Sequence, residues 1–436
     1  MPDRFKPGEE MQKTFKSEMK LRTYFSRYVP LIRPWGIAIA GTAILCLLLK
    51  IYIALTTYGT NDVAYFEKFL EIAKERGGVG LYHFRHPVLY FNHPPFMIHL
   101  LYFFDVLARL TGIGFPFWLK LPDILADLGS VFLVWKILAL KKKRKFEPIT
   151  LLMMAAAPAS IMTSGFHGNT DPLMIFLVLL SLYLIEKRKY PWLAGIVMGM
   201  AVNIKVVPVI FAPAIFLYLP NYRSRIEYFS AMGAAFLVGS LPYIYQDPVF
   251  ILNRVFGYPS IYGMWGFSRF LSYWLPESHW LNLAYENYGK FVIVAFIMAA
   301  SLRMNLRMKR PPLFMQLGFI TFIFMSLTPG FGIQYLAWLI PWVVGLGIAA
   351  TAIYYSASGI FQFLVYTYWS RGFPWFLADS GEVGVWGGYI IFFEIICWAS
   401  VFAITLFYLM PGKLKTDGTH SASVDKTVKK GKKRIT

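Results

Sequence analysis

The chain has 436 residues, of which 57% are hydrophobic and only 15% charged, and its mean hydropathy is +0.51. Soluble domains average about 45–50% apolar and about 25% charged residues, so this composition excludes a soluble enzyme, a disordered chain and a disulfide scaffold. The net charge of +20 does not indicate a nucleic-acid partner, because most Lys and Arg residues lie in short clusters between apolar runs.

Apolar runs recur from residue 36 to residue 409 and predict an all-α, polytopic membrane protein. We expect about 12 transmembrane helices in a membrane domain that covers 36–410. A basic N-terminal tail (1–35) and a basic C-terminal tail (411–436) flank it, and contacts with membrane lipids are expected throughout. The expected spans are 36–55, 117–140, 148–164, 171–186, 191–204, 206–219, 228–245, 290–303, 312–327, 335–352, 354–369 and 386–409.

Segment 96–112 is apolar but contains charged residues, and the basic clusters decide whether it spans the membrane. If the segment lies in the outer interface, all the basic clusters, including both tails and Lys141–Lys145, share the cytoplasmic side. We therefore predict an amphipathic interfacial helix here and a second one at 61–76, both within the outer loop 56–116. Both termini are then cytoplasmic, in the cell membrane or, in a eukaryote, in the ER membrane.

Two carboxylates stand out in the predicted outer loops. Asp62 follows the first span at the start of an interfacial helix, and Asp171 ends the polar loop 165–171. Each carboxylate could simply cap the helix that follows it. Because both lie on the same face of the membrane in this topology, they are also candidates for acid–base chemistry or for binding a divalent cation such as Mg²⁺ or Mn²⁺.

Basic and histidine side chains accompany these carboxylates. His86, His93 and His167 could bind a metal or a phosphate, or satisfy local hydrogen bonds. Lys205 lies between two apolar half-spans, where it could neutralise a lipid phosphate or extend to the interface. Arg269, in the long third outer loop, suits phosphate or a surface ion pair. On the second span, one helical face carries three charged residues that could pair with each other: Lys120, Asp123 and Asp127.

These residues lie in a series of short motifs that resembles the GT-C superfamily of membrane glycosyltransferases. The motifs, in chain order, are Thr60-Asn61-Asp62, Asn92-His93-Pro94-Pro95, the segment Lys120–Asp127, Gly168-Asn169-Thr170-Asp171-Pro172, Asn203-Ile204-Lys205 and the segment Thr328–Trp338. The resemblance covers residues 36–345. It implies a GT-C-like fold and transfer of a monosaccharide, most often mannose, from a polyprenyl-phosphate donor to a lipid, glycan or protein acceptor on the extracytoplasmic face.

The resemblance also implies residue roles. Asp62 would be the general base of an inverting transfer, and Asp171 would bind a metal or orient the acceptor. Donor phosphate would be stabilised by three side chains: Lys205, Arg269 and His167. The acceptor would be supported by Asn61, His93, Asn169, Gln334 and Tyr335. A metal, if bound, would be held by Asp62, Asp171 and His93. Because residues 60–63 contain no Asp-x-Asp or Asp-Glu pair, metal dependence stays open.

Two other classes of function remain open. A lipid or sugar transporter would use the break between 191–204 and 206–219, with Lys205 as an intramembrane basic site. A non-catalytic scaffold would not need this set of polar residues. An enzyme requires Asp62, Asp171 and Lys205 to converge within about 10 Å, the range over which charges interact without strong screening.

Overall fold

The computed structural model describes residues 34–86, 90–139, 147–257, 261–308, 311–383 and 386–409. Within these residues the chain is almost entirely helical, which confirms the predicted all-α, polytopic membrane fold. Residues 1–33 of the predicted N-terminal tail, the cluster Lys141–Lys145 and the predicted C-terminal tail lie outside the described residues.

The secondary-structure elements follow one another along the chain with short connections. In chain order they are the helix Pro34–Thr56, β1 (Gly59–Thr60), α2 (Asn61–His83), α3 (Phe96–Thr111), α4 (Phe115–Ala139), α5 (Pro148–Ala155), α6 (Pro158–Met162), the π-helix η1 (Thr163–His167), α7 (Asp171–Tyr183), the π-helix η2 (Leu184–Arg188), α8 (Pro191–Ile204), the 3₁₀-helix η3 (Val207–Phe211), α9 (Ala212–Tyr218), α10 (Tyr222–Gln246), α11 (Pro248–Phe256), α12 (Gly266–Trp274), α13 (Trp280–Arg307), α14 (Leu313–Leu327), the 3₁₀-helix η4 (Ile333–Leu339), α15 (Ile340–Val343), the 3₁₀-helix η5 (Val344–Leu346), α16 (Ile348–Trp369), β2 (Leu377–Ala378), α17 (Ser380–Val383) and α18 (Gly388–Leu409).

Five helical segments among the described residues are long and apolar enough to cross a membrane: Pro34–Thr56, Pro148–His167, Trp280–Arg307, Ile348–Trp369 and Gly388–Leu409. The bent pair α3 and α4, which meet at 114°, would make a sixth. Four further apolar helices are only 10–17 residues long, so the exact number of twelve spans stays a prediction.

Two interruptions explain why several predicted spans are short. Lys205 has extended backbone between α8 and η3, as expected for a broken helical hairpin. The predicted boundary between 335–352 and 354–369 is wrong. The first segment ends at Leu346, and Gly347, with φ of +101°, starts a new helix at Ile348. Glycine adopts this left-handed region without the steric penalty that other residues incur.

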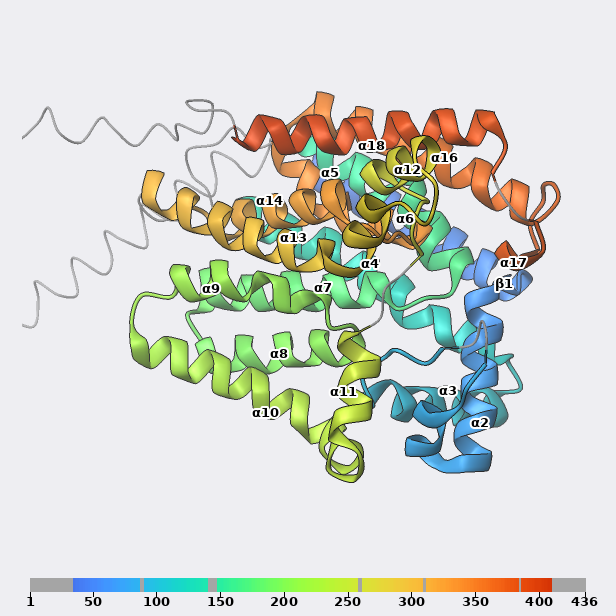
Figure 1. Ribbon diagram of the computed structural model, residues 1–436. Helices are drawn as coiled ribbons and strands as arrows, with labels where there is room; N and C mark the ends of the chain where they lie inside the picture. Colours follow the sequence, from blue (N-terminus) through green and yellow to red (C-terminus); the bar gives the residue numbers. More distant parts are fainter. Residues whose placement is uncertain are drawn as a thin grey trace, which may run out of the picture.

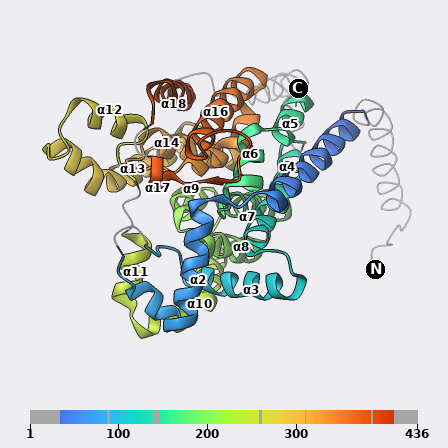
Figure 2. The ribbon, with the colours of Figure 1, turned by 90° about the vertical axis from the view of Figure 1, so that its right-hand side faces the viewer.

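Most of the helices lie roughly side by side in one bundle, while α2, α3 and α11 form a separate unit at one end (Figure 1). In the perpendicular view these three helices lie together along one side of the molecule, next to α8 and α10 (Figure 2). We call α2, α3 and α11 the outer unit. It has its own hydrophobic cluster, in which Phe66, Phe69 and Leu70 of α2 meet Leu101 of α3 and Ile251 of α11.

The predicted interfacial helices correspond to α2 and α3. The apolar face predicted for 61–76 is the buried face of α2, which bends at Gly77. Helix α3 turns away from α4 and buries a face that includes Met97, Ile98 and Leu101. The start of the outer unit is tied to the segment between α16 and α17. Strand β1, just before α2, pairs in parallel with β2, with Gly59 opposite Leu377.

Candidate functional site

Asp62 lies in the first turn of α2 but does not cap that helix. The N-cap is Thr60, whose hydroxyl accepts from the backbone N–H of Asp62 and donates to the carbonyl of His167 at 2.9 Å. The carboxylate of Asp62 is therefore free to turn toward the loop after η1. There, Nδ2 of Asn169 donates to Oδ2 at 2.6 Å, and Nε2 of His167 lies 3.1 Å from the same oxygen.

The loop 163–171 brings these two partners to Asp62 through an unusual backbone. A π-helix ends at His167, and Gly168 follows with φ of +79°. A Cβ atom at Gly168 would lie 2.3 Å from Cγ2 of Val63, so only glycine fits between the loop and the first turn of α2. The loop is almost completely buried, with the side chains of His167 and Asn169 both directed to the same carboxylate.

A buried hydrogen-bond chain continues from His167 into α16. Nδ1 of His167 lies 2.8 Å from the hydroxyl of Tyr366, and Nε2 of Gln362 donates to that hydroxyl at 2.7 Å and to Thr163 at 2.8 Å. Because Gln362 donates to the Tyr366 hydroxyl, that hydroxyl donates its own O–H to Nδ1, and the imidazole N–H is then on Nε2, facing Asp62.

The charge state of Asp62 reflects a balance of opposing effects. Burial raises the pKa of this carboxyl, but the hydrogen bonds from His167 and Asn169 and the charge of Lys205 outweigh burial and leave the pKa below its usual value of 3.8. The side chain keeps 25% of its surface exposed. Asp62 is thus an ionised, oriented carboxylate that a ligand can still reach.

Asp171 does not cap α7 either, although it is the first residue of that helix. Its carboxylate is fully buried and accepts from Nζ of Lys205 at 2.8 and 2.7 Å. Trp338 donates its indole N–H to the same carboxylate. The cap function passes to Asp123 of α4, which accepts from the backbone N–H of Leu173 at 3.0 Å.

Lys205 stands where the two half-spans meet and contributes to both carboxylate environments. Its ammonium group lies 5.3 Å from the centre of the Tyr335 ring and 5.9 Å from that of Trp338. Its side chain is 13% exposed. We call Asp62, His167, Asn169, Asp171 and Lys205 the Asp62 cluster, because Lys205 pairs with Asp171 and its charge also acts on Asp62.

His93 borders the Asp62 cluster from the loop before α3. Its ring packs near Phe66 and Phe91, at 5.2 and 5.7 Å between centres, and reaches the backbone of Ile204. Burial and then the charge of Lys205 lower the pKa of His93 to about 4. His93 is therefore neutral at physiological pH.

Other predicted site residues take different places. Asn61 accepts from the hydroxyl of Ser380 at 3.1 Å and so fastens the start of α2 to α17. Arg269 pairs with Glu394 at 3.1 Å and, among the described residues, makes no ion pair or hydrogen bond with the Asp62 cluster. Gln334 is half-buried and folds against Gly332, whereas Tyr335 faces Lys205.

Lys120, Asp123 and Asp127, interpreted from the sequence mainly as a structural network, do not pair with one another, because each side chain reaches a different element. Lys120 donates to the carbonyl of Thr57 at 3.0 Å, and Asp123 caps α7. Asp127 accepts from Lys50 of the first helix at 2.7 Å and from Ser160 at 2.6 Å. Buried polar groups on a membrane helix find partners on neighbouring helices because no water is available.

The residues offered for a metal do not form a metal site. Both oxygens of Asp171 are engaged by Lys205, and one oxygen of Asp62 is engaged by two donors. No group of three His, Cys, Asp or Glu residues with suitable geometry exists in the described part of the chain. A divalent cation would have to displace the ammonium of Lys205 before it could bridge the two carboxylates, so the donor set does not fit a resident cation.

Sequence reasoning missed several residues that hold this site. Tyr366 and Gln362 lie 199 positions from His167 and Thr163, in an apolar helix where the sequence predicts only core residues. Trp338 ends the motif Thr328–Trp338, but nothing local predicts its contact with Asp171, 167 positions earlier. Lys50 was hidden in the first apolar run. A lysine within an apolar span by itself predicts a functional site or an ion pair, so Lys50 could have been identified from the sequence.

The helical membrane fold agrees with a comparison of the sequence with known families, which identifies this chain as a membrane glycosyltransferase of the GT-C type. It belongs to glycosyltransferase family 87, whose sequence model matches residues 91–355. That range includes His93, His167, Asp171 and Lys205 and begins after Asp62.

Two curated proteins are similar to part of the chain. GPI mannosyltransferase 1 of Schizosaccharomyces pombe is 30% identical over 113 residues, which are 26% of this chain and 30% of that protein. GPI mannosyltransferase 1 of Gibberella zeae is 29% identical over 117 residues, 26% of this chain and 27% of that protein. The matches thus span less than a third of either relative.

Proposed function

We propose that this glycosyltransferase moves a mannosyl residue from a polyprenyl-phosphate donor to a hydroxyl of a lipid, glycan or protein acceptor, with inversion at the anomeric carbon. The mannosyl assignment is supported by the names of the two partial relatives. The proposed site is the Asp62 cluster, on the extracytoplasmic side of a protein whose two termini are cytoplasmic.

One observation carries the proposal: the two oxygens of Asp62 have different surroundings. Asn169 and His167 both engage Oδ2. Oδ1 has no hydrogen-bond partner among the described residues, on a side chain that is 25% exposed. A carboxylate held through one oxygen and open at the other is suited to accept a proton from a substrate hydroxyl.

The proposed step balances as a direct displacement. The acceptor oxygen forms a bond to the anomeric carbon while its proton passes to Oδ1 of Asp62. The bond between the anomeric carbon and the phosphate oxygen breaks, and polyprenyl phosphate leaves with the electron pair. Attack opposite the leaving group inverts the configuration through an oxocarbenium-like state, as in inverting glycosidases.

Lys205 is proposed to stabilise the charge that develops on the departing phosphate. Its ammonium has three N–H donors, and two of them meet the oxygens of Asp171. The third donor remains for a phosphate oxygen, on a side chain that is 13% exposed. Asp171 would then hold Lys205 in position, and His167 would fix the orientation of Asp62. Arg269 would need to leave Glu394 to take part.

The alternative of a lipid or sugar transporter with a basic site at Lys205 is less well supported. The helix is broken at this residue, as a transport site could require. However, Lys205 is bound to Asp171 through two hydrogen bonds, and the chain belongs to a glycosyltransferase family.

A donor panel tests the proposal. The purified protein is incubated in neutral detergent with polyprenyl-phosphate mannose, glucose and arabinose and a panel of lipid-linked and free glycan acceptors. We expect acceptor-dependent release of polyprenyl phosphate from the mannosyl donor and a product of inverted configuration by NMR. Turnover of another donor would overturn the mannosyl assignment. Retention of configuration would overturn the single-displacement mechanism.

A further inference from the structure

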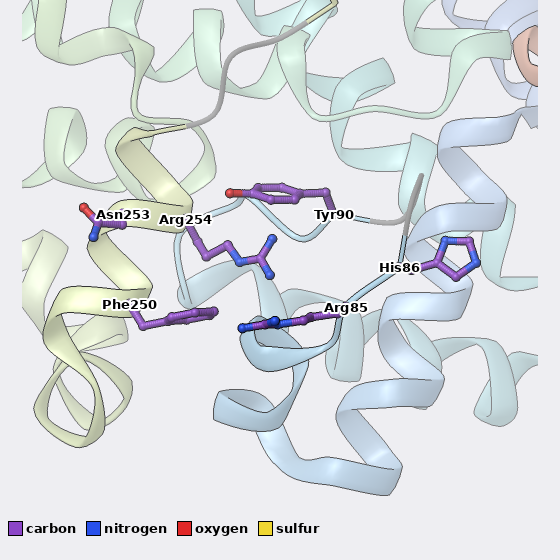
Figure 3. Close-up of a pocket in the computed structure, with 6 residues that line it drawn as sticks. All are labelled: Arg85, His86, Tyr90, Phe250, Asn253 and Arg254. Atoms are coloured by element: carbon purple, nitrogen blue, oxygen red, sulfur yellow. The ribbon is translucent and has the colours of Figure 1, made fainter.

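A second polar site lies in the outer unit, in a cleft of about 560 Å³ between α11 and the loop that follows α2. Figure 3 shows two arginine side chains that extend toward the same part of the cleft from opposite sides, Arg85 from the loop and Arg254 from α11. The described residues that line the cleft are Arg85, His86, Tyr90, Phe250, Asn253 and Arg254.

Arg254 is held by aromatic rings and not by a carboxylate. Its guanidinium carbon lies 4.0 Å from the centre of the Tyr90 ring and 5.2 Å from that of Phe250. Phe250 in turn stacks on His83 at 4.2 Å. A guanidinium stacked on ring faces keeps its N–H groups in its own plane, where they can bind an oxyanion through two parallel hydrogen bonds.

Neither arginine has an anionic partner among the described residues. The ion pairs of the outer unit use other side chains, since Asp247 pairs with His83 at 3.0 Å and Asp105 pairs with Lys74 at 2.8 Å. None of the described residues that line the cleft is acidic. Two guanidinium groups that share a cleft without a carboxylate repel each other, and an anion between them would remove that repulsion.

The cleft is close to the Asp62 cluster, but none of the described residues that line it belongs to that cluster. Tyr90 lines the cleft, and His93, three residues later, borders Asp62 and Lys205. Three extended residues span at most about 10 Å. The donor phosphate is bonded directly to the anomeric carbon, so it must lie within a few bonds of Asp62 during transfer. An anion in the arginine cleft therefore belongs to a different part of the substrates.

We propose that Arg85 and Arg254 bind a phosphate or phosphodiester group of the acceptor, which makes the natural acceptor an anionic molecule. This inference rests on the proposed function only in assigning the group to the acceptor. The existence of an anion site in the cleft stands apart from the transfer reaction and can be measured without it.

The first test measures binding without turnover. The full-length protein in neutral detergent is titrated with inorganic phosphate and with glycerol 3-phosphate by isothermal calorimetry. We expect saturable binding that weakens about 10-fold or more in Arg254→Gln and in Arg85→Gln, because a hydrogen-bonded charge is lost. The matched control is Arg223→Gln, an exposed arginine of α10 that pairs with Glu227. Absence of saturable binding, or equal binding by all variants, overturns the anion site.

Arg85 is the safer variant for folding because its side chain is exposed. Arg254→Lys adds a second check, since it keeps the charge but loses the two-pronged geometry and should recover part of the affinity.

The second test identifies the source of the phosphate. Transfer is compared between a phosphate-bearing glycolipid acceptor and its neutral counterpart, in nanodiscs of phosphatidylcholine with or without phosphatidylglycerol. We expect Arg85→Gln to raise the acceptor KM about 10-fold for the phosphate-bearing acceptor and to leave the neutral acceptor unchanged. An equal rise in KM for the donor with both acceptors would assign the cleft to the donor. An effect of the variant that depends on phosphatidylglycerol alone would assign it to bilayer lipid. Either result overturns the acceptor assignment.

The anion site and the proposed transfer reaction can be supported or overturned independently of each other. Phosphate binding that depends on the two arginines, without any mannosyl transfer, would support the anion site and overturn the proposed mannosyl transfer. Mannosyl transfer without such phosphate binding would support the proposed function and overturn the anion site.

Discussion

Nε2 of His167 lies 3.1 Å from Oδ2 of Asp62, although 105 positions separate the two residues in the chain. The contact joins the first turn of α2 to the loop before α7, and Tyr366 of α16 extends it on the other side of the imidazole. Three separate parts of the chain therefore determine where the open oxygen of Asp62 points.

The variant Tyr366→Phe tests whether this chain positions the carboxylate. Loss of the hydroxyl leaves Nδ1 of His167 without its partner and frees the imidazole to change tautomer or orientation. We expect kcat to fall about 10-fold or more with little change in the donor KM, and the pH–rate profile to shift.

The control for this variant is Tyr355→Phe, in the same helix. Tyr355 is also buried, but its hydroxyl donates to the carbonyl of Ile340, away from the Asp62 cluster. An equal loss of activity in the two variants, with an unshifted pH–rate profile in each, would mean that Tyr366 contributes only to packing.

The sequence was sufficient to identify the residues of the Asp62 cluster but not how they are connected. Asp62, Asp171, Lys205, His167 and Asn169 stood out because polar groups near apolar spans are costly. The structure brings them together, while the roles assigned to them stay predictions. Helix capping, the simpler interpretation of both carboxylates, is wrong, because Thr60 and Asp123 supply the capping oxygens.

The buried pair of Asp171 and Lys205 should be strongly coupled. Asp171→Leu leaves an enclosed ammonium group and the indole N–H of Trp338 without an acceptor. We expect this single variant to lower the free energy of unfolding by about 3–5 kcal/mol, measured by denaturant unfolding in detergent. The double variant Asp171→Leu with Lys205→Met should lose less than the sum of the two single variants.

The matched comparison is Asp105→Asn, whose two partners, Lys74 and Arg109, are 43% and 69% exposed. A partly exposed pair of this kind contributes about 1 kcal/mol or less. Additive losses for Asp171 and Lys205 would contradict the coupling, and with it the role of Asp171 as the residue that holds Lys205.

The lowered pKa of His93 predicts that the free energy of unfolding depends on pH. Its pKa is lowered from 6.5 to about 4 in the folded protein, so between these values the unfolded chain binds a proton that the folded chain does not. Stability is therefore unaffected by this group above about pH 6.5 and falls as the pH drops toward 4. The maximum loss is about 3 kcal/mol.

Thermal unfolding in detergent at pH 4.5 and pH 7 measures this effect. The wild type should lose more stability on acidification than His93→Gln, whose side chain does not titrate. His83→Gln is the control, because His83 is exposed and pairs with Asp247 outside the Asp62 cluster. Identical pH sensitivity of the wild type and His93→Gln would show that His93 can be protonated without cost in the fold.

Long-range pairing accounts for most of what sequence reasoning could not supply. Nothing near Arg269 predicts that Glu394, 125 positions later, neutralises it, since both residues sit in apolar surroundings. Lys50 and Asp127 likewise pair across two helices. Helix existence follows from local apolar patterns, whereas such partners depend on which helix faces meet in the bundle.

The kinetics of Asp62→Asn test the central claim most directly. Asparagine keeps the shape and the hydrogen-bonding oxygen of the side chain but cannot accept the proton. We expect the rate of mannosyl transfer to fall about 100-fold or more, with donor binding retained. The control Glu71→Gln, an exposed carboxylate of the same helix, should stay within about threefold of the wild type. If Asp62→Asn instead retains wild-type turnover, Asp62 is not the base and the proposed mechanism fails.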